Sequence, residues 1–380
     1  MSASHAGPGP VSAVIGGQRV QLLDKARIYA CGITPYDVTH LGHAATFVWL
    51  DALARVIGFL GAEPEVCRNV TDVDDVLHAA AGRAGAPYDT FAAIQQFQFD
   101  QDMAALRVRA PEHEPRAHRY VEQVIRLAAG LVSTGAAYTR GGSVYFRAGD
   151  VATRAGLDAA AARSLSAEFG GRPDDPAKDD PMDVAVWQAG EPGHPAWDSP
   201  WGPGRPGWHA ECAAMSMSVF GAAVDIHGGG ADLRFPHHAY HGAMAEAFTG
   251  VRPYARAWFR VGVVTIDGAK MAKSAGNLVL VDKLLATHPA PVVRLMVLDR
   301  PWAESWEYTP ALLDRAAGRL SGLYQAAGRG GTAGQAGGAA LAELRRLLAT
   351  DLDVPAALDL AIAEGGACAR TLATVLELSS

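Results

Sequence analysis

Lysine is scarce in this chain, although basic residues are not. Of the 33 basic side chains among 380 residues, five are lysines: Lys25, Lys178, Lys270, Lys273 and Lys283. Two of the five stand three positions apart in the segment KMAKS at 270–274. In so lysine-poor a sequence, this spacing favours a functional pair over ordinary solvated surface.

Other scarcities exclude whole classes of protein. Four scattered cysteines are too few for a disulfide framework. No apolar run approaches the ~20 residues that span a membrane, and the N-terminus has neither the basic start nor the apolar stretch of a signal peptide. We therefore expect a cytoplasmic protein with no membrane partner. A net charge of −7 argues against a general nucleic-acid binder, although a local basic face could still bind one.

The pattern that is present near the N-terminus is strand, helix, strand. Residues 26–31 predict a short buried strand, 43–60 carry apolar residues at helical spacing up to Gly61, and 64–70 predict a second strand. This order indicates an α/β fold with a parallel sheet, in which ligands bind at the carboxyl ends of the strands. Cys31 and 69–71 follow those ends.

The remaining chain predicts further units around this core. We expect helices over 90–137, a hairpin at 138–147 around Gly141-Gly142, an irregular loop over 165–207, and strands at 223–227 and 259–266. Helices follow from about 308, interrupted by a glycine-rich linker at 326–340. The predicted domains are a first catalytic half (1–90), a helical or connective insertion (91–185), a second catalytic half (186–300) and a C-terminal helical domain (301–380).

A metal site is one interpretation of the cysteines and histidines. Cys31 follows a strand, Cys212 ends the segment GWHAEC, and His237 and His241 would share one face of a helix that begins near Pro236. Two thiolates with one or two imidazoles match zinc. His209 is a weaker candidate. The alternative is buried thiols beside a pair of helix histidines, because the wide cysteine spacing is not that of a zinc finger.

Three segments suit phosphate groups. His40 and His43 in HLGH stand at a predicted helix N-terminus, which favours anions. Lys270 and Lys273 lie in a Gly/Ser-rich loop that could hold a leaving pyrophosphate by charge. The glycines of 228–230 allow the backbone to approach a nucleotide closely.

At this point the sequence resembles a known family. HLGH and KMAKS resemble the HIGH and KMSKS signatures of class I aminoacyl-tRNA synthetases, which have a Rossmann-like parallel sheet. The cysteinyl branch is matched in order by NVTDVDD, DMAALRV, WDSPWGPGRPGWHAEC and HGGGADLRFPHH. Within that branch, GITPYD and GHAAT are similar to the cysteine:glucosaminylinositol ligases of mycothiol biosynthesis, whereas the tRNA synthetases more usually have GPTVYD and GHAR.

The resemblance implies a role for each matching residue. Zinc, one ion per chain, would be bound by Cys31, Cys212 and His237, with His241 as an open fourth candidate at a position where cysteinyl-tRNA synthetases have a glutamate. The substrate L-cysteine would contact Gly32, Thr34, Thr71 and Trp208. The catalytic groups would be His40 and His43 at the α-phosphate and Lys270 and Lys273 at the pyrophosphate. ATP is expected to bind with Mg²⁺. The residues that would contact ATP and the adenylate, some of them already named, are His43, Gly228, Gly229, Gly230, Asp232, Lys273 and Ser274.

The implied product is an amide of cysteine with the amine of an amino sugar. Residues 301–380 contain six arginines, no lysine and nine acidic residues. A tRNA-holding appendage should be basic, so we expect neither tRNA as a partner nor a full anticodon-binding domain. Three alternatives stay open: a paralogue that transfers cysteine to another amine or a carrier protein, a true cysteinyl-tRNA synthetase, and a non-catalytic binding protein. A monomer is the expected state.

Departures from the family pattern bear on the acceptor. Ala272 replaces the usual serine of KMSKS, and Ala239 replaces the glutamate that commonly follows the paired histidines. Both loop lysines are kept. The activation chemistry is therefore still expected, while the base for the amide-forming step has no candidate in the sequence.

Overall fold

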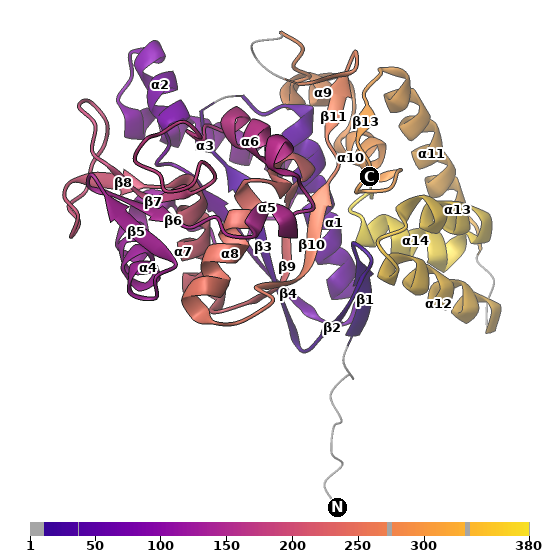
Figure 1. The fold of residues 1–380 in the computed structure, drawn as a ribbon. Helices are drawn as coiled ribbons and strands as arrows, with labels where there is room; N and C mark the ends of the chain where they lie inside the picture. Colours follow the sequence, from indigo (N-terminus) through magenta and orange to yellow (C-terminus); the bar gives the residue numbers. More distant parts are fainter. Residues whose placement is uncertain (1–10, 37, 272–275, 331–334, 380) are drawn as a thin grey trace, which may run out of the picture.

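The computed structural model describes residues 11–36, 38–271, 276–330 and 335–379. Its centre is a four-stranded sheet in the order β10-β9-β3-β4, formed by Ala255–Val261, Val224–Gly230, Lys25–Ile33 and Glu63–Val70. All three pairings are parallel. The predicted strands at 26–31, 64–70 and 223–227 are confirmed. Figure 1 shows this sheet in the middle of the molecule, with a hairpin of β1 (Val11–Ile15) and β2 (Gln18–Leu22) near its base.

Helix α1 (Leu41–Leu60) connects β3 to β4, as the sequence predicted. Gly61 ends it in a left-handed conformation with φ of 105°, which glycine adopts without steric cost. Among the described residues, α1 alone is long and apolar enough to cross a membrane, and 72% of that stretch is buried inside the protein. It is the core helix of the fold, packed on the sheet and on the C-terminal helices.

The order of the strands creates a crevice. From β3 the chain passes to β4 on one side, and β9 returns to the other side of β3. Connections that leave a strand pair in opposite directions open a crevice at the carboxyl ends, where α/β proteins bind ligands. Residues 31–36, 38–43 and 228–232 therefore meet at the carboxyl end of the sheet.

The segment between β4 and β9 contains helices, as predicted, and also a sheet. Its helices are α2 (Asp75–Ala84), α3 (Tyr88–Ala105), α4 (Val121–Ser133), α5 (Val151–Arg154), α6 (Ala159–Glu168) and α7 (Trp208–Phe220). The helical prediction for 90–137 is wrong at 106–116, where residues 113–116 run beside β4, and at 134–137, which follow α4. There the N–H groups of Arg68 and Val70 donate to the carbonyls of His113 and Pro115.

An antiparallel sheet in this segment has the order β5-β6-β7-β8, formed by Ala137–Arg140, Ser143–Phe146, Val184–Ala189 and Gly204–Pro206. The predicted hairpin at 138–147 is confirmed, with positive φ at Gly141 and Gly142. The prediction of an irregular loop over 165–207 is wrong at 165–168, 184–189 and 204–206, which belong to α6, β7 and β8. β7 pairs with β6 and with β8, and both pairings join segments that are distant in sequence.

Beyond α8 (His237–Thr249) and β10, the chain forms a small sheet of β11 (Val264–Ile266), β12 (Ala269–Lys270) and β13 (Trp306–Glu307). The single strand predicted at 259–266 is therefore two strands. Gly262 separates them, and a Cβ there would lie 2.0 Å from the carbonyl oxygen of Glu304. Helices α9 (Val281–Thr287) and α10 (Ala290–Leu298) follow β12.

Four helices complete the chain: α11 (Ala311–Gly328), α12 (Gln335–Ala349), α13 (Val354–Glu364) and α14 (Gly366–Val375). The glycine-rich linker predicted over 326–340 is wrong at both ends, because α11 continues to Gly328 and α12 begins at Gln335. Ala340, Leu344 and Leu348 on α12 are buried in the main core, so tertiary packing offsets the weak helix propensity of the glycines.

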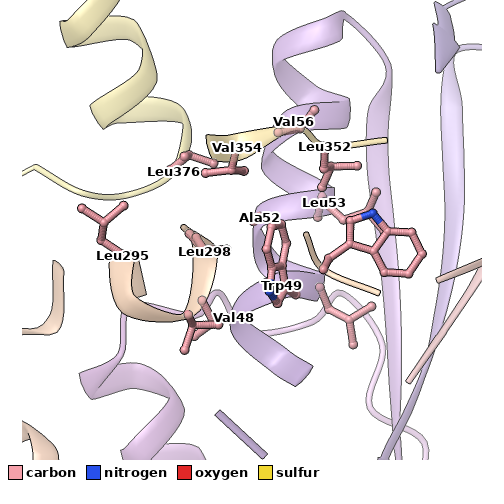
Figure 2. Close-up of a cluster of buried hydrophobic side chains, with 14 of the residues drawn as sticks. Val48, Trp49, Ala52, Leu53, Val56, Leu295, Leu298, Leu352, Val354 and Leu376 are labelled. Atoms are coloured by element: carbon pink, nitrogen blue, oxygen red, sulfur yellow. The ribbon is translucent and has the colours of Figure 1, made fainter. Parts of the chain in front are cut away.

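These helices pack on the core rather than forming a separate body. In Figure 2, Trp49 and Leu53 of α1 lie beside Leu298 of α10 and Leu352, within one cluster that also includes Val354 and Leu376.

Candidate active site

A cavity of about 580 Å³ opens at the carboxyl ends of the central strands, a volume typical of small-molecule sites. Its walls come from the end of β3, the first turn of α1, the starts of α7 and α8, and the β10–β12 region. The lining includes most of the residues predicted for the site: Cys31, Gly32, Thr34, His40, His43, Thr71, Trp208, Cys212, Gly230, Asp232, His237 and Lys270.

His40 and His43 shape the N-terminus of α1. His40 is the N-cap, and its Nδ1 accepts the backbone N–H of Gly42 at 3.1 Å. The N–H of His40 in turn donates to Nδ1 of His43 at 3.5 Å, and the two rings stack with centroids 3.9 Å apart. A Cβ at position 42 would lie 2.9 Å from the ring of His40, so a larger residue there would displace this ring from its capping position. The paired imidazoles thus stand at a helix end that favours anions.

His43 is held in its neutral form. Burial, together with the positive charges possible on His40 and Lys270, lowers its pKa to about 3. At neutral pH its ring is therefore an uncharged hydrogen-bonding group.

Lys270 and Asp232 meet inside the cavity. The Nζ of Lys270 lies 2.6 Å from Oδ2 of Asp232, and the same ammonium lies 5.8 Å from the ring centre of Phe169. The other predicted residues of this loop, Lys273 and Ser274, lie outside the described residues, as does Ala272.

Two thiols and several imidazoles lie close together at the cavity, and Cys31, Cys212 and His237 among them line it. The ligand atoms of Cys31, Cys212 and His241 all lie within 4.8 Å of one another, and Nε2 of His237 is 3.3 Å from Sγ of Cys212. Burial alone would raise the pKa of Cys212, but the hydrogen bond with Cys31 and the neighbouring His237 hold that pKa well below its usual range. A thiol that ionises easily is a good metal ligand.

His241 is buried rather than facing solvent. Its Nδ1 lies 3.1 Å from Nε2 of His227, while its Nε2 has no hydrogen-bond partner among the described residues. A buried unpaired nitrogen is costly. Together with the two thiols, this unpaired nitrogen gives a donor set that fits zinc.

The predicted cysteine-binding residues all line this cavity. The N–H of Gly32 donates to Oδ1 of Asn69 at 3.0 Å, and Nδ2 of Asn69 donates to Oγ1 of Thr71 at 3.0 Å. Trp208 stacks on His237 with ring centres 4.2 Å apart. Thr34 lines the same cavity.

Gly228 and Gly229 are outside the set of cavity-lining residues. A Cβ at Gly228 would lie 2.3 Å from Leu50 of α1, and one at Gly229 would lie 2.9 Å from His238. In this structure their missing side chains allow α1 and α8 to pack closely against β9.

Sequence reasoning did not identify several residues that belong to this region. Asp74, Glu168, Phe169 and Met271 line the cavity, and His227 lies 3.9 Å from Cys31. The sequence feature that could have pointed to His227 is its position in the motif HGGGAD. No sequence feature pointed to Glu168 and Phe169, because they lie at the end of α6 in the inserted segment and outside any motif.

The family described as "tRNA synthetases class I (C) catalytic domain" matches residues 19–318. The fold resembles that of Mycobacterium tuberculosis methionyl-tRNA synthetase bound by methionyl-adenylate, with a TM-score of 0.66 at 17% identity over 92% of this chain and 84% of that one. An arginyl-tRNA synthetase structure from Campylobacter jejuni, described as putative, gives a TM-score of 0.57 at 13% identity, covering 93% and 85%. At these identities the likeness concerns the fold.

Sequence relatives are much more similar. A protein of Frankia casuarinae named L-cysteine:1D-myo-inositol 2-amino-2-deoxy-alpha-D-glucopyranoside ligase is 42% identical over 87% of this chain and 72% of its own length. Proteins of the same name from Nocardia farcinica and Mycobacterium marinum are each 43% identical, over 88% of this chain and 82% of theirs.

Proposed function

Because the chain belongs to the class I (C) tRNA synthetase family, and within it to the L-cysteine:1D-myo-inositol 2-amino-2-deoxy-alpha-D-glucopyranoside ligases, we propose that it is an ATP-dependent ligase. It activates L-cysteine as cysteinyl-adenylate and transfers the cysteinyl group to the amine of that amino sugar, as in mycothiol biosynthesis. ATP binds with Mg²⁺.

One observation carries this proposal. A single cavity is lined by the His40–His43 pair, by Lys270 and by Cys31, Cys212 and His237. A module that only binds ligands needs no such combination of anion-binding and metal-binding groups.

In the first step, a carboxylate oxygen of cysteine attacks the α-phosphate, and the bond to the leaving pyrophosphate breaks. His40 and His43 hydrogen-bond the phosphate at the N-terminus of α1, where the helix dipole favours the developing negative charge. Lys270, with Lys273 of the same loop, binds the departing pyrophosphate. To do so, Lys270 has to exchange its contact with Asp232 for one with phosphate oxygens.

Cys31, Cys212 and His237 would hold zinc, and His241 is positioned as an additional ligand. Bound there, zinc supplies a soft Lewis acid for the thiolate of substrate cysteine. Serine and alanine lack that thiolate, whereas a pocket that measured size alone would discriminate by only ~1–3 kcal/mol per methylene. Gly32, Thr34, Thr71 and Trp208 position the amino acid, and Gly230 and Asp232 lie on the adenylate side.

In the second step the neutral amine attacks the carbonyl carbon of the adenylate. The C–N bond forms, the bond from that carbon to the AMP oxygen breaks, and the amine loses a proton. The products are the amide and AMP.

Cysteine-dependent exchange of labelled pyrophosphate into ATP tests the activation step. We expect exchange with cysteine and at least about a hundredfold less with serine or alanine, since both lack the metal-binding thiolate. Equal exchange with serine, or none with cysteine, would contradict the proposed function.

A further inference from the structure

A second cavity, of about 190 Å³, is lined by side chains from α5, α8, β10 and the turn at 231–234. Figure 1 shows α5 beside α8. Among the described residues, this cavity shares no lining residue with the active-site cavity. The consecutive residues His237 and His238 line different cavities, the first the active site and the second this one. The second cavity is therefore a separate site, which neither step of the proposed reaction uses.

The charge of this cavity is positive. Three arginines line it, Arg154, Arg234 and Arg260, against one carboxylate, that of Glu246. Oε2 of Glu246 lies 2.6 Å from Nη2 of Arg154 and 3.6 Å from Nε of Arg252, so this carboxylate is already neutralised. In the part of the chain that the structure describes, neither Arg234 nor Arg260 forms an ion pair. Two guanidinium charges at one cavity are thus left without a counter-ion.

Arg260 has an unsatisfied hydrogen-bond donor. Its Nε is buried and has no partner among the described residues, while its guanidinium carbon lies 4.5 Å from the ring centre of Trp258. Burial and the nearby charge of Arg234 lower the pKa of Arg260 to about 10. A buried N–H without an acceptor is costly, and a negatively charged ligand would satisfy the donor and offset the repulsion between the two arginines.

His238 is a second polar group that lacks a partner. Its side chain is fully buried, and neither ring nitrogen forms a hydrogen bond with the described residues. A neutral imidazole has one N–H donor and one acceptor in either tautomer, and buried polar groups in proteins are usually paired. The ligand atoms of His238, Cys31 and His227 also lie within 4.8 Å of one another, so the metal cluster is the alternative partner of this ring.

Small residues on α8 leave room in the cavity. Ala239, Gly242 and Ala243 line it, and none of them extends beyond Cβ. The volume of about 190 Å³ is several times the ~30 Å³ share of one water molecule and below the ~300 Å³ at which drug-sized sites begin. It suits a small ion rather than a nucleotide.

We propose that this cavity binds a small phosphate-type oxyanion, held by the guanidinium groups of Arg234 and Arg260 and by an N–H of His238. A guanidinium group presents its N–H donors in a planar fork that matches the oxygens of phosphate. Inorganic phosphate and pyrophosphate share this chemistry. The site is additional to the proposed function and does not depend on it.

Isothermal titration calorimetry of the full-length enzyme tests the site by measuring the Kd for inorganic phosphate and for pyrophosphate at constant ionic strength. Arg260→Gln and Arg234→Gln each remove one guanidinium group, and Arg234 is exposed, so its replacement should keep the fold. Arg126→Gln is the matched control, because it removes the same charge from an exposed pair with Glu122 on α4. Lys270→Ala reports on anions that bind in the active-site cavity instead.

We expect the Kd for inorganic phosphate to rise by at least about tenfold in Arg260→Gln and Arg234→Gln, since each loses a charged hydrogen-bond donor, and to stay within about twofold of wild type in Arg126→Gln. Lys270→Ala should retain this binding event with an unchanged Kd. Tighter binding of inorganic phosphate would identify the free anion as the ligand, and tighter binding of pyrophosphate would identify the product of the activation step; both outcomes support the site. No binding by wild type, or binding that is lost in Lys270→Ala and kept in the two cavity variants, would overturn it.

His238→Asn separates the anion from the metal as the partner of this ring. We expect weaker phosphate binding and unchanged zinc content by elemental analysis. Loss of zinc with unchanged phosphate binding would assign His238 to the metal cluster and overturn its place in the anion site.

Discussion

Lys270 Nζ lies 2.6 Å from Oδ2 of Asp232, and both residues line the cavity. This ion pair joins Lys270 to the 3-10 turn at 231–234 that follows β9. Its side chains are half-exposed, so the contact itself contributes little to stability. The contact matters because it holds the ammonium group of Lys270 inside the cavity, where the phosphate groups would bind.

Replacing this lysine should impair activation. We expect Lys270→Ala to lower cysteine-dependent pyrophosphate exchange by about a hundredfold, as for the loss of one preorganised charge at a transition state. Lys283→Ala is the control, since Lys283 is exposed on α9 and pairs with Asp282 at 3.5 Å. A Lys270→Ala enzyme within threefold of wild type would exclude the assigned role.

The neutral state of His43 has a consequence for acid stability. The folded-state pKa of His43 is about 3, below its usual value of 6.5, so the unfolded chain binds a proton at His43 that the folded chain excludes. Folding stability therefore falls as pH drops from about 6.5 toward 3. We expect the thermal midpoint of His43→Asn to fall less between pH 7.5 and 5.5 than that of wild type. His288 does not line the cavity, so the thermal midpoint of His288→Asn should fall as much as that of wild type. Identical falls in all three proteins would contradict the assigned role of His43 in acid stability.

Zinc content should depend on the thiol–imidazole cluster. We expect about one equivalent in wild type by elemental analysis and a large loss in Cys212→Ser and His237→Asn. Cys368→Ala is the control, because Cys368 is buried among the C-terminal helices. His241→Ala tests the additional ligand: unchanged zinc content and unchanged affinity for cysteine would remove His241 from the set.

A buried arginine joins α10 to α1 and to the residue that follows α14. Arg294 on α10 is fully buried, lies 2.7 Å from Asp51 of α1 and donates to the carbonyls of Leu106 and Leu376. Arg294→Met leaves those acceptors unpaired, so we expect a loss of about 3 kcal/mol in the free energy of unfolding, measured with urea. The exposed pair of Arg346 with Glu343 supplies the control, since Arg346→Gln should cost less than about 1 kcal/mol. Equal costs would show that Arg294 has no special structural role.

Local pattern was enough to predict the catalytic half of the fold. The apolar spacing of 43–60 and the glycine at 61 predicted both ends of α1 to within two residues. This was possible because the buried face of a core helix repeats with the helical period along the sequence. β7 and β8 were missed because their segment is rich in proline and glycine and their pairing is non-local. The start of helix α12, at 335–340, was missed because burial of Leu344 and Leu348 farther along the helix outweighs the propensity of the glycines.

The site residues also differ in whether local sequence could predict them. HLGH, KMAKS and the cysteines were visible as motifs, so their residues could be predicted individually. The contact of His227 with Cys31, and the position of Phe169 against Trp208, depend on strand order and on the path of the inserted segment. Spacing in the sequence carries no information about either contact.

The most direct test of the central claim is a competition for activated cysteine. Purified enzyme is given ATP, L-cysteine, glucosaminylinositol and tRNA together, and the products are separated by mass spectrometry and acid precipitation. The account predicts cysteinyl-glucosaminylinositol amide and AMP in equal amounts, with cysteine on tRNA at background level. Efficient formation of Cys-tRNA without the amide would contradict it.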